Sequence, residues 1–223
     1  MCEKERCFLS CYAVLDLEMC KIPDDKMPEH FDLEQEIIQI GAVLLDENYE
    51  TVSEFATYVS PVYGEIDSFI HKLTGISMSD LEGAPTARKA LADFLEWLPE
   101  DAVAVSWSTA DCNQIRKEIE SKQLPLEGFY HYFDTWNDCQ KTFSEKMKTS
   151  KVYKLSEALA IADIKSVDGE HTAIADAENT ALLFKKMCTE KEFKVSSVLV
   201  TDESSSHLTY TPFANLLDLF NDD

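Results

Sequence analysis

The stretch FLSCYAVLDLE at residues 8–18 is apolar and rich in strand-favouring residues, and it ends in two carboxylates. Residues 8–17 predict a buried β-strand, because a short apolar run bounded by polar residues is typical of a strand covered on both faces. Side chains two apart on a strand point to the same face, so Asp16 and Glu18 are expected side by side at its end. Two neighbouring carboxylates in an apolar setting are costly unless a cation lies between them.

The segments after this strand predict two more strands and then strands alternating with helices. Residues 36–45 and 52–59 predict strands joined by a turn at 46–48, and short helical pieces are expected near 68–74. The later elements are a helix opened by Pro85 and Thr86, a strand at 102–107, a helix at 109–120, a strand at 129–133 and helices at 154–162 and 173–187. This order predicts an α/β fold with a mixed sheet of about five strands flanked by helices.

Length and apolar content predict one domain with a short appendage. The chain has 223 residues, of which 45% are hydrophobic, enough for one buried core. We expect the domain to span residues 1–189. Residues 190–223 would form a C-terminal extension, with a hairpin at 195–211 and a short helix at 213–220, packed on the domain or at an oligomer interface. The start lacks a signal-peptide pattern and no run approaches the ~20 apolar residues of a membrane helix, so a soluble, cytoplasmic protein is expected.

The charge and the cysteines restrict the classes of function. Asp and Glu outnumber Lys and Arg by 42 to 20, for a net charge of −22. A protein that grips a long duplex normally carries a basic face, so this composition argues against tight, extended nucleic-acid binding. It remains compatible with a small acidic cleft neutralised by divalent cations. The seven cysteines form no CxxC pair and are expected to be free thiols.

Three further residues carry chemistry-bearing side chains at defined places. Asp111 falls in the first turn of a helix that follows the short strand at 102–107, and His171 opens a late helix with Asp176 five residues further on. Each has an ordinary structural explanation when taken alone. An acid in a first turn is favoured by the helix dipole, and a lone His at a helix start usually has a structural role.

The order and spacing of these residues are more informative than any one of them. Asp-x-Glu, an Asp after a middle strand and His-x₄-Asp in a late helix together resemble the DEDDh exonucleases, which have a ribonuclease H-like fold and degrade nucleic acids from the 3′ end. The segments EIIQIGAV at 36–43, FIHKLTGI at 69–76 and VSWSTAD at 105–111 resemble its Eri-like branch, which includes histone-mRNA and small-RNA trimming enzymes and bacterial relatives such as KapD. The resemblance covers residues 8–188. Two departures, Met19 after Glu18 and the helix start STAD, remove no functional group.

The resemblance implies a catalytic set and a mechanism. Asp16, Glu18, Asp111 and Asp176 would hold two Mg²⁺ or Mn²⁺ ions, and such pairs lie ~3.5–4 Å apart in two-metal sites. His171 would take the proton from the attacking water, because an imidazole with a pKa of ~6.5 suits that task near neutral pH. The products would be nucleoside 5′-monophosphates.

The expected substrate is a single strand with a free 3′ end, RNA more than DNA. Met19, Leu73 and Trp107 are candidates to contact the terminal bases, although each residue type is also common in a core. Asp134, an acid at an expected strand end, matches no ligand position and is left out of the site. The alternative function is a non-catalytic nucleic-acid-binding or regulatory domain that retains the fold. Loss of one of the five catalytic residues would favour it, and all five are present.

Overall fold

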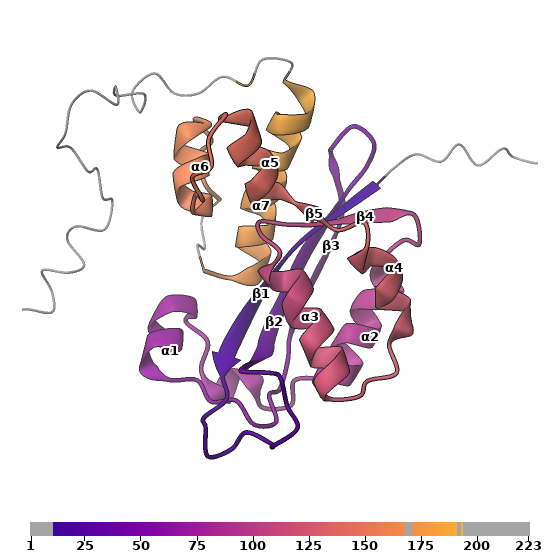
Figure 1. Ribbon diagram of the computed structural model, residues 1–223, viewed down its shortest axis with the longest axis vertical. Coiled ribbons are helices and arrows are strands. Elements are labelled where there is room, and N and C mark those ends of the chain that lie inside the picture. Colours follow the sequence, from indigo (N-terminus) through magenta and orange to yellow (C-terminus); the bar gives the residue numbers. More distant parts are fainter. Residues whose placement is uncertain (1–10, 168–170, 191–192, 194–223) are drawn as a thin grey trace, which may run out of the picture.

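The computed structural model describes residues 11–167, 171–190 and 193, and within them the strands form one five-stranded sheet (Figure 1). The first three strands make an antiparallel meander, and the last two extend the sheet in parallel on the other side of the first, which gives the order β3-β2-β1-β4-β5. The predicted mixed α/β sheet is confirmed. The strands are β1 (Cys11–Lys21), β2 (Gln35–Leu45), β3 (Thr51–Tyr58), β4 (Ala102–Ser106) and β5 (Asn137–Asp138).

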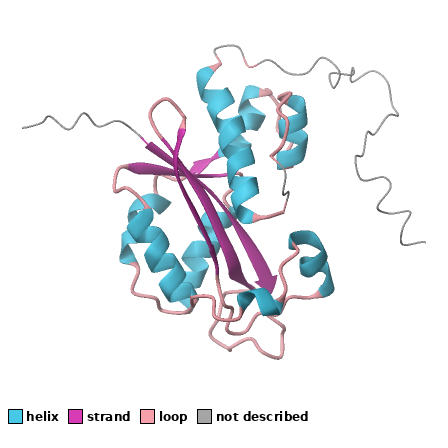
Figure 2. Ribbon diagram, turned by 180° about the vertical axis from the view of Figure 1, so that it is seen from behind, coloured by secondary structure: helices cyan, strands magenta, loops and turns pink. Residues whose placement is uncertain are grey.

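Helices cover both faces of this sheet, as the view from behind shows (Figure 2). One core lies between the sheet and the segment from α2 to α4, and a second lies between the sheet and the three helices that follow β5. A third, smaller cluster contains Cys20, Ile38, Ile76 and Leu81. The helices are α1 (Ser68–Thr74), η1 (Met78–Leu81), α2 (Ala87–Trp97), α3 (Ala110–Ser121), η2 (Glu127–Phe129), α4 (Tyr130–Phe133), α5 (Cys139–Lys146), α6 (Leu155–Ile161) and α7 (Ala173–Thr189).

The pairing of β1 with β2 contains one irregularity. Glu18 lies opposite Gln39, but Met19 lies opposite Ile37, so Ile38 is an extra residue on β2. Such a bulge changes which face the residues beyond it point to. Ile37 and Ile40 are three residues apart and would face opposite sides of a regular strand, yet both belong to the core beneath α2 and α3.

Two sequence-based predictions of strands are corrected. The first strand was expected to end at residue 17 but continues to Lys21, so Asp16 and Glu18 lie within it rather than at its end. Residues 129–133 were expected to form a strand but contain the end of η2 and the helix α4, and Asp134 follows that helix. The aromatic rings there pack on α2, with Phe129 against Phe94 at 6.1 Å between ring centroids.

The fifth strand is shorter and later than expected. Asn137 and Asp138 pair with the end of β4. Asp138 then caps α5, which the sequence pattern did not predict, by accepting a 2.8 Å hydrogen bond from the backbone N–H of Lys141. This places α5 directly beside the end of β4.

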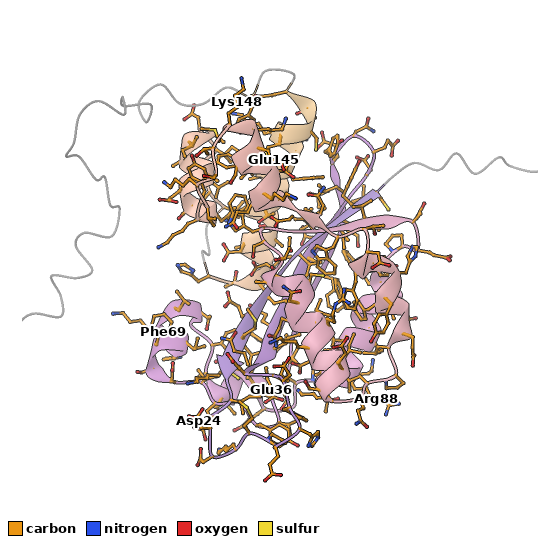
Figure 3. All side chains as sticks on the ribbon, viewed as in Figure 1. Asp24, Glu36, Phe69, Arg88, Glu145 and Lys148 are labelled. Atoms are coloured by element: carbon orange, nitrogen blue, oxygen red, sulfur yellow. The ribbon has the colours of Figure 1, made fainter. Side chains whose placement is uncertain are left out.

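A buried charged network lies near one end of the β1–β2 pair, where Figure 3 labels Glu36. The Glu36 carboxylate is fully buried and accepts hydrogen bonds from the backbone N–H groups of Val62, Tyr63 and Gly64. Lys122, at the end of α3, forms ion pairs with both Glu36 and Glu118. We call Glu36, Glu118 and Lys122 the lysine triad. It ties β2, α3 and the loop that leads to α1 into one unit.

The remaining predictions concern cysteines, membranes and the C-terminus. Cys11, Cys20, Cys112, Cys139 and Cys188 are free thiols, as expected. Cys2, Cys7 and the predicted C-terminal hairpin and helix lie outside the described residues. Within the described ranges, no helix has the length and apolar character needed to cross a membrane.

Candidate active site

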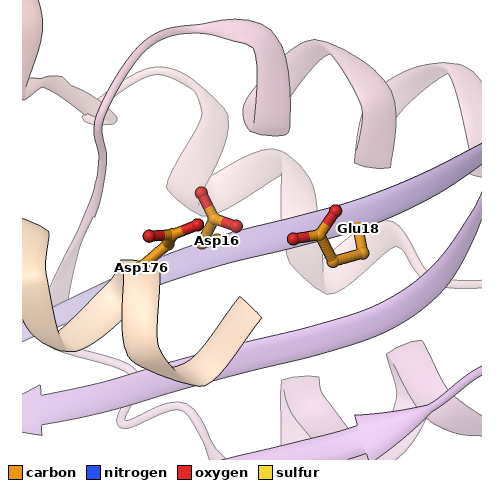
Figure 4. A group of neighbouring side chains, drawn as sticks. All are labelled: Asp16, Glu18 and Asp176. Atoms are coloured by element: carbon orange, nitrogen blue, oxygen red, sulfur yellow. The ribbon is translucent and has the colours of Figure 1, made fainter. Parts of the chain in front are cut away.

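Three carboxylates from two elements converge on one face of the sheet. Asp16 and Glu18 are two apart on β1 and therefore share a face, and Asp176 reaches them from the first turn of α7 (Figure 4). One oxygen from each of the three carboxylates can be chosen so that all lie within 4.8 Å of one another. Asp176 is 160 positions from Asp16 in the sequence, and the fold brings the two side chains together.

The close approach of α7 to β2 positions Asp176. Gly41 lies opposite Asp16 on β2, and a Cβ atom there would lie 2.2 Å from the Ala173 carbonyl carbon and from the Ile174 backbone nitrogen. Only glycine allows this contact. Gln39, two residues before Gly41, accepts a 3.0 Å hydrogen bond at its Oε1 from the backbone N–H of Ala173. Thr172 caps the helix by accepting from Ala175.

Asp111 lies close enough to this group for its charge to raise the pKa values of Asp16 and Glu18. It is 5% exposed, in the first turn of α3, as the sequence predicted. Burial raises the pKa of its carboxyl to about 7. Hydrogen bonds from the backbone of Asp111 and Leu17 and from the Ser106 side chain favour the charged form and lower this pKa, but burial has the larger effect. The hydrogen bond with the Leu17 backbone brings the Asp111 carboxyl next to Leu17, which is the residue between Asp16 and Glu18 on β1.

The four carboxylates oppose one another's ionisation. Burial raises the pKa of Asp16 well above its ordinary value, and the charges of Asp111, Asp176 and Glu18 raise it further. Burial, followed by the charges of Asp176 and Asp111, raises the pKa of Glu18 to about 8. We call Asp16, Glu18, Asp111 and Asp176 the site carboxylates. Their chemistry fits a divalent cation, because hard ions such as Mg²⁺ prefer carboxylate oxygens and would relieve this repulsion.

His171 lies immediately before the cap of α7 and does not join the group of three carboxylates. Its φ angle is 69°, in the left-handed region that non-glycine residues rarely adopt. Residues held in that region cost about 1–3 kcal/mol and are enriched at functional sites. The side chain is half-buried.

The three candidate base-contacting residues lie in different surroundings. Met19 follows Glu18 on β1 and is half-buried, and Leu73 on α1 is 37% exposed. Trp107 is half-buried, packs near Phe143 at 6.1 Å between ring centroids and donates from its ring N–H to the Tyr153 carbonyl at 3.2 Å. Phe69, one turn before Leu73 on α1, is 68% exposed, and the sequence analysis did not select it.

Gln39 and Gly41 were also not predicted from the sequence, although they position α7. A glycine inside an apolar strand indicates a close backbone approach, so Gly41 carried a usable signal. Gln39 carried none, because its partner Ala173 is 134 residues away in the chain.

This chain resembles known proteins over most of its described residues. A sequence model described as an exonuclease family matches residues 13–184. The chain belongs to this exonuclease family. The match includes Asp16, Glu18, Asp111 and Asp176, together with the strand that carries Gly41. The predicted resemblance to exonucleases of the ribonuclease H-like fold is confirmed.

Relatives within this exonuclease family include proteins of both DNA and RNA metabolism. The chain is 31% identical over 168 residues to a PolC-type DNA polymerase III of Caldanaerobacter subterraneus subsp. tengcongensis, with 75% of this chain and 11% of the relative covered. It is 31% identical over 180 residues to ERI1 exoribonuclease 2 of Danio rerio, with 70% of this chain and 32% of the relative covered. The chain therefore spans a third or less of these two relatives.

A solved exonuclease structure shares the fold. It is the nuclease domain of 3′hExo, described as a DEDDh family member bound to rAMP, and its TM-score with this chain is 0.68. The sequences are 19% identical, and the match covers 85% of this chain and 98% of the other. At this identity the likeness establishes the architecture.

Proposed function

We propose that this exonuclease is metal-dependent and removes nucleotides one at a time from the 3′ end of a single strand, releasing nucleoside 5′-monophosphates. The observation that carries the proposal is the convergence of Asp16, Glu18 and Asp176 within 4.8 Å, with Asp111 alongside. Mutual repulsion among these groups is costly in the absence of a counter-charge, so the arrangement serves a purpose other than stability.

The site carboxylates would hold two divalent cations, Mg²⁺ or Mn²⁺. When bound, such ions lower the pKa of a bound water and stabilise the charge that develops on the leaving oxygen. Gly41 and Gln39 of β2 hold α7, which carries Asp176, close to the sheet, and Asp16 lies opposite Gly41 on the paired strand β1. Backbone contacts would therefore preorganise these two ligands.

His171 would accept the proton of the attacking water. Its position next to the cap of α7, five residues before Asp176, keeps it close to the carboxylates in the chain. An imidazole can take up and release a proton, which is the chemistry that a general base requires.

Leu73, Met19 and Trp107 would contact the terminal nucleotides, with Phe69 as an addition. Phe69 and Leu73 are four residues apart on α1, so both exposed side chains lie on one side of that helix. Stacking of a base on an aromatic side chain contributes ~1–3 kcal/mol and tolerates any sequence.

RNA is proposed as the preferred substrate. The resemblance of EIIQIGAV and FIHKLTGI to the Eri-like branch and the match to an exoribonuclease support RNA, whereas the match to a DNA polymerase keeps DNA as the second candidate. The net charge of −22 favours short single strands, since few phosphates then need neutralising. The location is proposed to be cytoplasmic.

The test uses single-stranded RNA and DNA of the same sequence, each labelled at the 5′ end or at the 3′ end. Each is incubated with Mg²⁺, Mn²⁺ or EDTA, in parallel with an Asp16→Asn variant. Stepwise shortening of the 5′-labelled strand and early release of a labelled mononucleotide from the 3′-labelled strand are expected, with metal only. If neither polymer is shortened with either metal, the proposed activity is wrong and a non-catalytic binding domain becomes the better explanation.

A further inference from the structure

One segment of this acidic chain has the opposite charge. Residues 141–154 contain five lysines and a single acid, Glu145, whereas the whole chain has 42 Asp and Glu against 20 Lys and Arg. We call residues 141–154 the lysine segment. It comprises most of α5 and the loop to α6, and Figure 3 labels Lys148 and Glu145 on it. All five lysines are exposed; they are Lys141, Lys146, Lys148, Lys151 and Lys154.

These lysines differ from most other lysines in the described part of the chain. Within the described part of the chain, Lys151 is the one member of the five that forms an ion pair, with Glu157 at 3.6 Å. Six lysines outside the segment are paired with carboxylates; they are Lys26, Lys89, Lys117, Lys122, Lys185 and Lys186. Lysines whose charge is not neutralised within the protein concentrate positive potential in the lysine segment.

The loop part of the segment is held in a defined conformation. The Ser144 hydroxyl donates to the Lys151 carbonyl at 2.8 Å, and the backbone N–H of Thr149 donates to the Ser144 carbonyl at 3.1 Å. The Lys151 ammonium lies 4.6 Å from the centre of the Tyr153 ring. The lysines are therefore presented from a fixed backbone, which reduces the entropy lost when they bind a ligand.

Both ends of the segment are attached to Trp107, which lies between β4 and the helix α3 that carries Asp111. The Trp107 carbonyl accepts a 2.7 Å hydrogen bond from the Gln140 backbone, and the Trp107 ring N–H donates to the Tyr153 carbonyl at 3.2 Å. Gln140 also donates from its side chain to Tyr153 at 2.7 Å. Trp107 directly follows β4 and precedes Asp111 by four residues. Lys141 and Lys154 thus adjoin the anchors on Trp107, and the other three lysines lie further along the segment.

We propose that the lysine segment binds the phosphate backbone of the single strand upstream of the nucleotide being removed. The inference rests on the proposed function and adds the path of the substrate. Lysine ammonium groups bind phosphates as point charges and read no sequence, which suits an enzyme that must accept successive nucleotides. A local basic segment also explains how a chain with a net charge of −22 holds a polyanion.

The test measures binding without cleavage. A single-stranded RNA of about 20 nucleotides, longer than the ~4–16 that a single-strand-binding fold covers, carries fluorescein at its 5′ end, and fluorescence anisotropy is recorded in EDTA. The variant is Lys148→Gln with Lys151→Gln, and the matched control is Arg88→Gln with Lys89→Gln on α2, at the other end of the molecule (Figure 3). A Lys148→Arg with Lys151→Arg variant keeps the charge.

The expected result is a roughly tenfold or greater loss of affinity at about 50 mM salt for the Lys148→Gln with Lys151→Gln variant. The slope of log K against log salt should become shallower by about 0.7 for each phosphate that the variant no longer neutralises. The Arg88→Gln with Lys89→Gln control and the arginine variant should bind as the natural protein does. If the Lys148→Gln with Lys151→Gln variant binds like that control, the inference is overturned, and an acidic protein becomes the partner to test.

Failure of this inference is distinguishable from failure of the proposed function. Binding is measured in EDTA, so it does not depend on catalysis. Cleavage by the natural protein combined with unchanged binding by the lysine variant overturns the binding path and leaves the exonuclease activity standing. If the natural protein cleaves neither RNA nor DNA but the lysine variant binds RNA less tightly, the binding path is supported and the proposed exonuclease activity is overturned.

Discussion

Two groups of acids lie along the β1–β2 pair, and their charges are compensated differently. The acids of the lysine triad are buried, whereas three of the four site carboxylates are half-buried. The lysine triad (Glu36, Glu118, Lys122) contains its own cation, and backbone N–H groups donate to Glu36. In the described residues, neither Asp16 nor Glu18 forms an ion pair with a lysine or an arginine.

The difference appears in the pKa values of the two groups. Burial favours the neutral form of Glu36, but Lys122 and the N–H groups of Gly64 and Val62 outweigh burial and hold its pKa below the ordinary value. Burial raises the pKa of Glu118 to about 7 despite Lys122. In the site, burial and like charges act in the same direction, and the pKa of Glu18 rises to about 8. In the triad, Lys122 opposes the effect of burial on both glutamates. In the site, we propose that a bound divalent cation has this role.

The largest effect is expected when the triad loses its cation. Lys122→Met leaves two buried carboxylates facing each other and should lower the free energy of unfolding by about 3–5 kcal/mol, as for other broken buried ion pairs. Urea denaturation measures it. The matched control is Lys117→Met on the same helix, whose ion pair with Asp32 is exposed, and it should change stability by less than about 1 kcal/mol. Equal losses of stability in the two variants would show that the buried lysine triad contributes no more than an exposed ion pair.

A neutral residue in the site should have the reverse effect on stability and abolish most activity. Asp16→Asn removes one ligand charge, and the rate of cleavage should fall at least about 10²-fold, the loss seen when one electrostatic group leaves an active site. In EDTA the same variant should melt higher than the natural protein, because repulsion with Glu18, Asp111 and Asp176 is relieved.

The control is Asp32→Asn at a side chain that is 95% exposed, where neither rate nor melting temperature should change. A lower melting temperature for Asp16→Asn in EDTA would contradict the inference that repulsion among the site carboxylates destabilises the folded protein.

Gly41→Ala should disturb the site without changing a ligand. The added Cβ atom meets the backbone of Ala173 and Ile174, so the start of α7 must move away from β2, at a cost of about 1–3 kcal/mol typical of overpacking. Asp176 moves with it, and half-maximal activity should require about tenfold more Mg²⁺.

A second variant tests the same contact without the added atom. Gln39→Ala removes the hydrogen bond to Ala173 and should also raise the Mg²⁺ requirement, with a smaller loss of stability. An unchanged metal requirement in both variants would show that α7 needs no help from β2 to place Asp176.

The pH dependence of stability should be the smallest of these effects and depend on metal. Folding raises the pKa of Glu18 to about 8 and that of Asp111 to about 7, so the folded state binds more protons than the unfolded state between pH ~4 and 8. The stability that protonation of Glu18 and Asp111 contributes is therefore fully present below the ordinary carboxyl pKa range and is lost as pH rises through 7 to 8. In EDTA, melting temperature should fall by a few degrees from pH 5 to 8, since about 1 kcal/mol corresponds to ~2–4 °C in a domain of this size.

Adding Mn²⁺ in the same series should flatten the curve, because a bound cation removes the preference for protons. Scanning calorimetry over that pH range measures both. A melting temperature that rises with pH in EDTA would reverse the sign of the linkage and show that the carboxylates are already neutralised.

The sequence predicted the fold where local pattern and tertiary structure agree. The apolar runs of β1, β2 and β4 and the amphipathic α2 formed as expected. The end of β1 was misplaced because two charges look like the end of a buried strand, and nothing local shows that they belong to a site. Residues 129–133 are aromatic, which favours strands in general, but here Phe129 and Phe133 pack on helices.

The sequence predicted a set of candidate site residues but not their geometry, and the roles of these residues stay predictions. The order of Asp16, Glu18, Asp111 and Asp176 identified them through a resemblance to known exonucleases. The supporting contacts of Gln39 and the lysine triad join residues far apart in the chain, and no periodicity reveals such pairs. Gly41 is the exception, because a glycine within a strand is itself a signal.

The extra residue Ile38 on β2 sets the orientation of the lysine triad relative to the site carboxylates, so both groups depend on the number of residues in this strand. Loss of the single codon for Ile38 would leave every side chain of both groups intact, yet it would turn residues 35–37 over relative to Gln39 and Gly41. Ile37 would leave the core beneath α2 and α3, and Glu36 would point away from Lys122. Insertions and deletions should therefore be excluded from this strand during evolution, even where substitutions are tolerated, and chain length there should vary less than amino-acid identity.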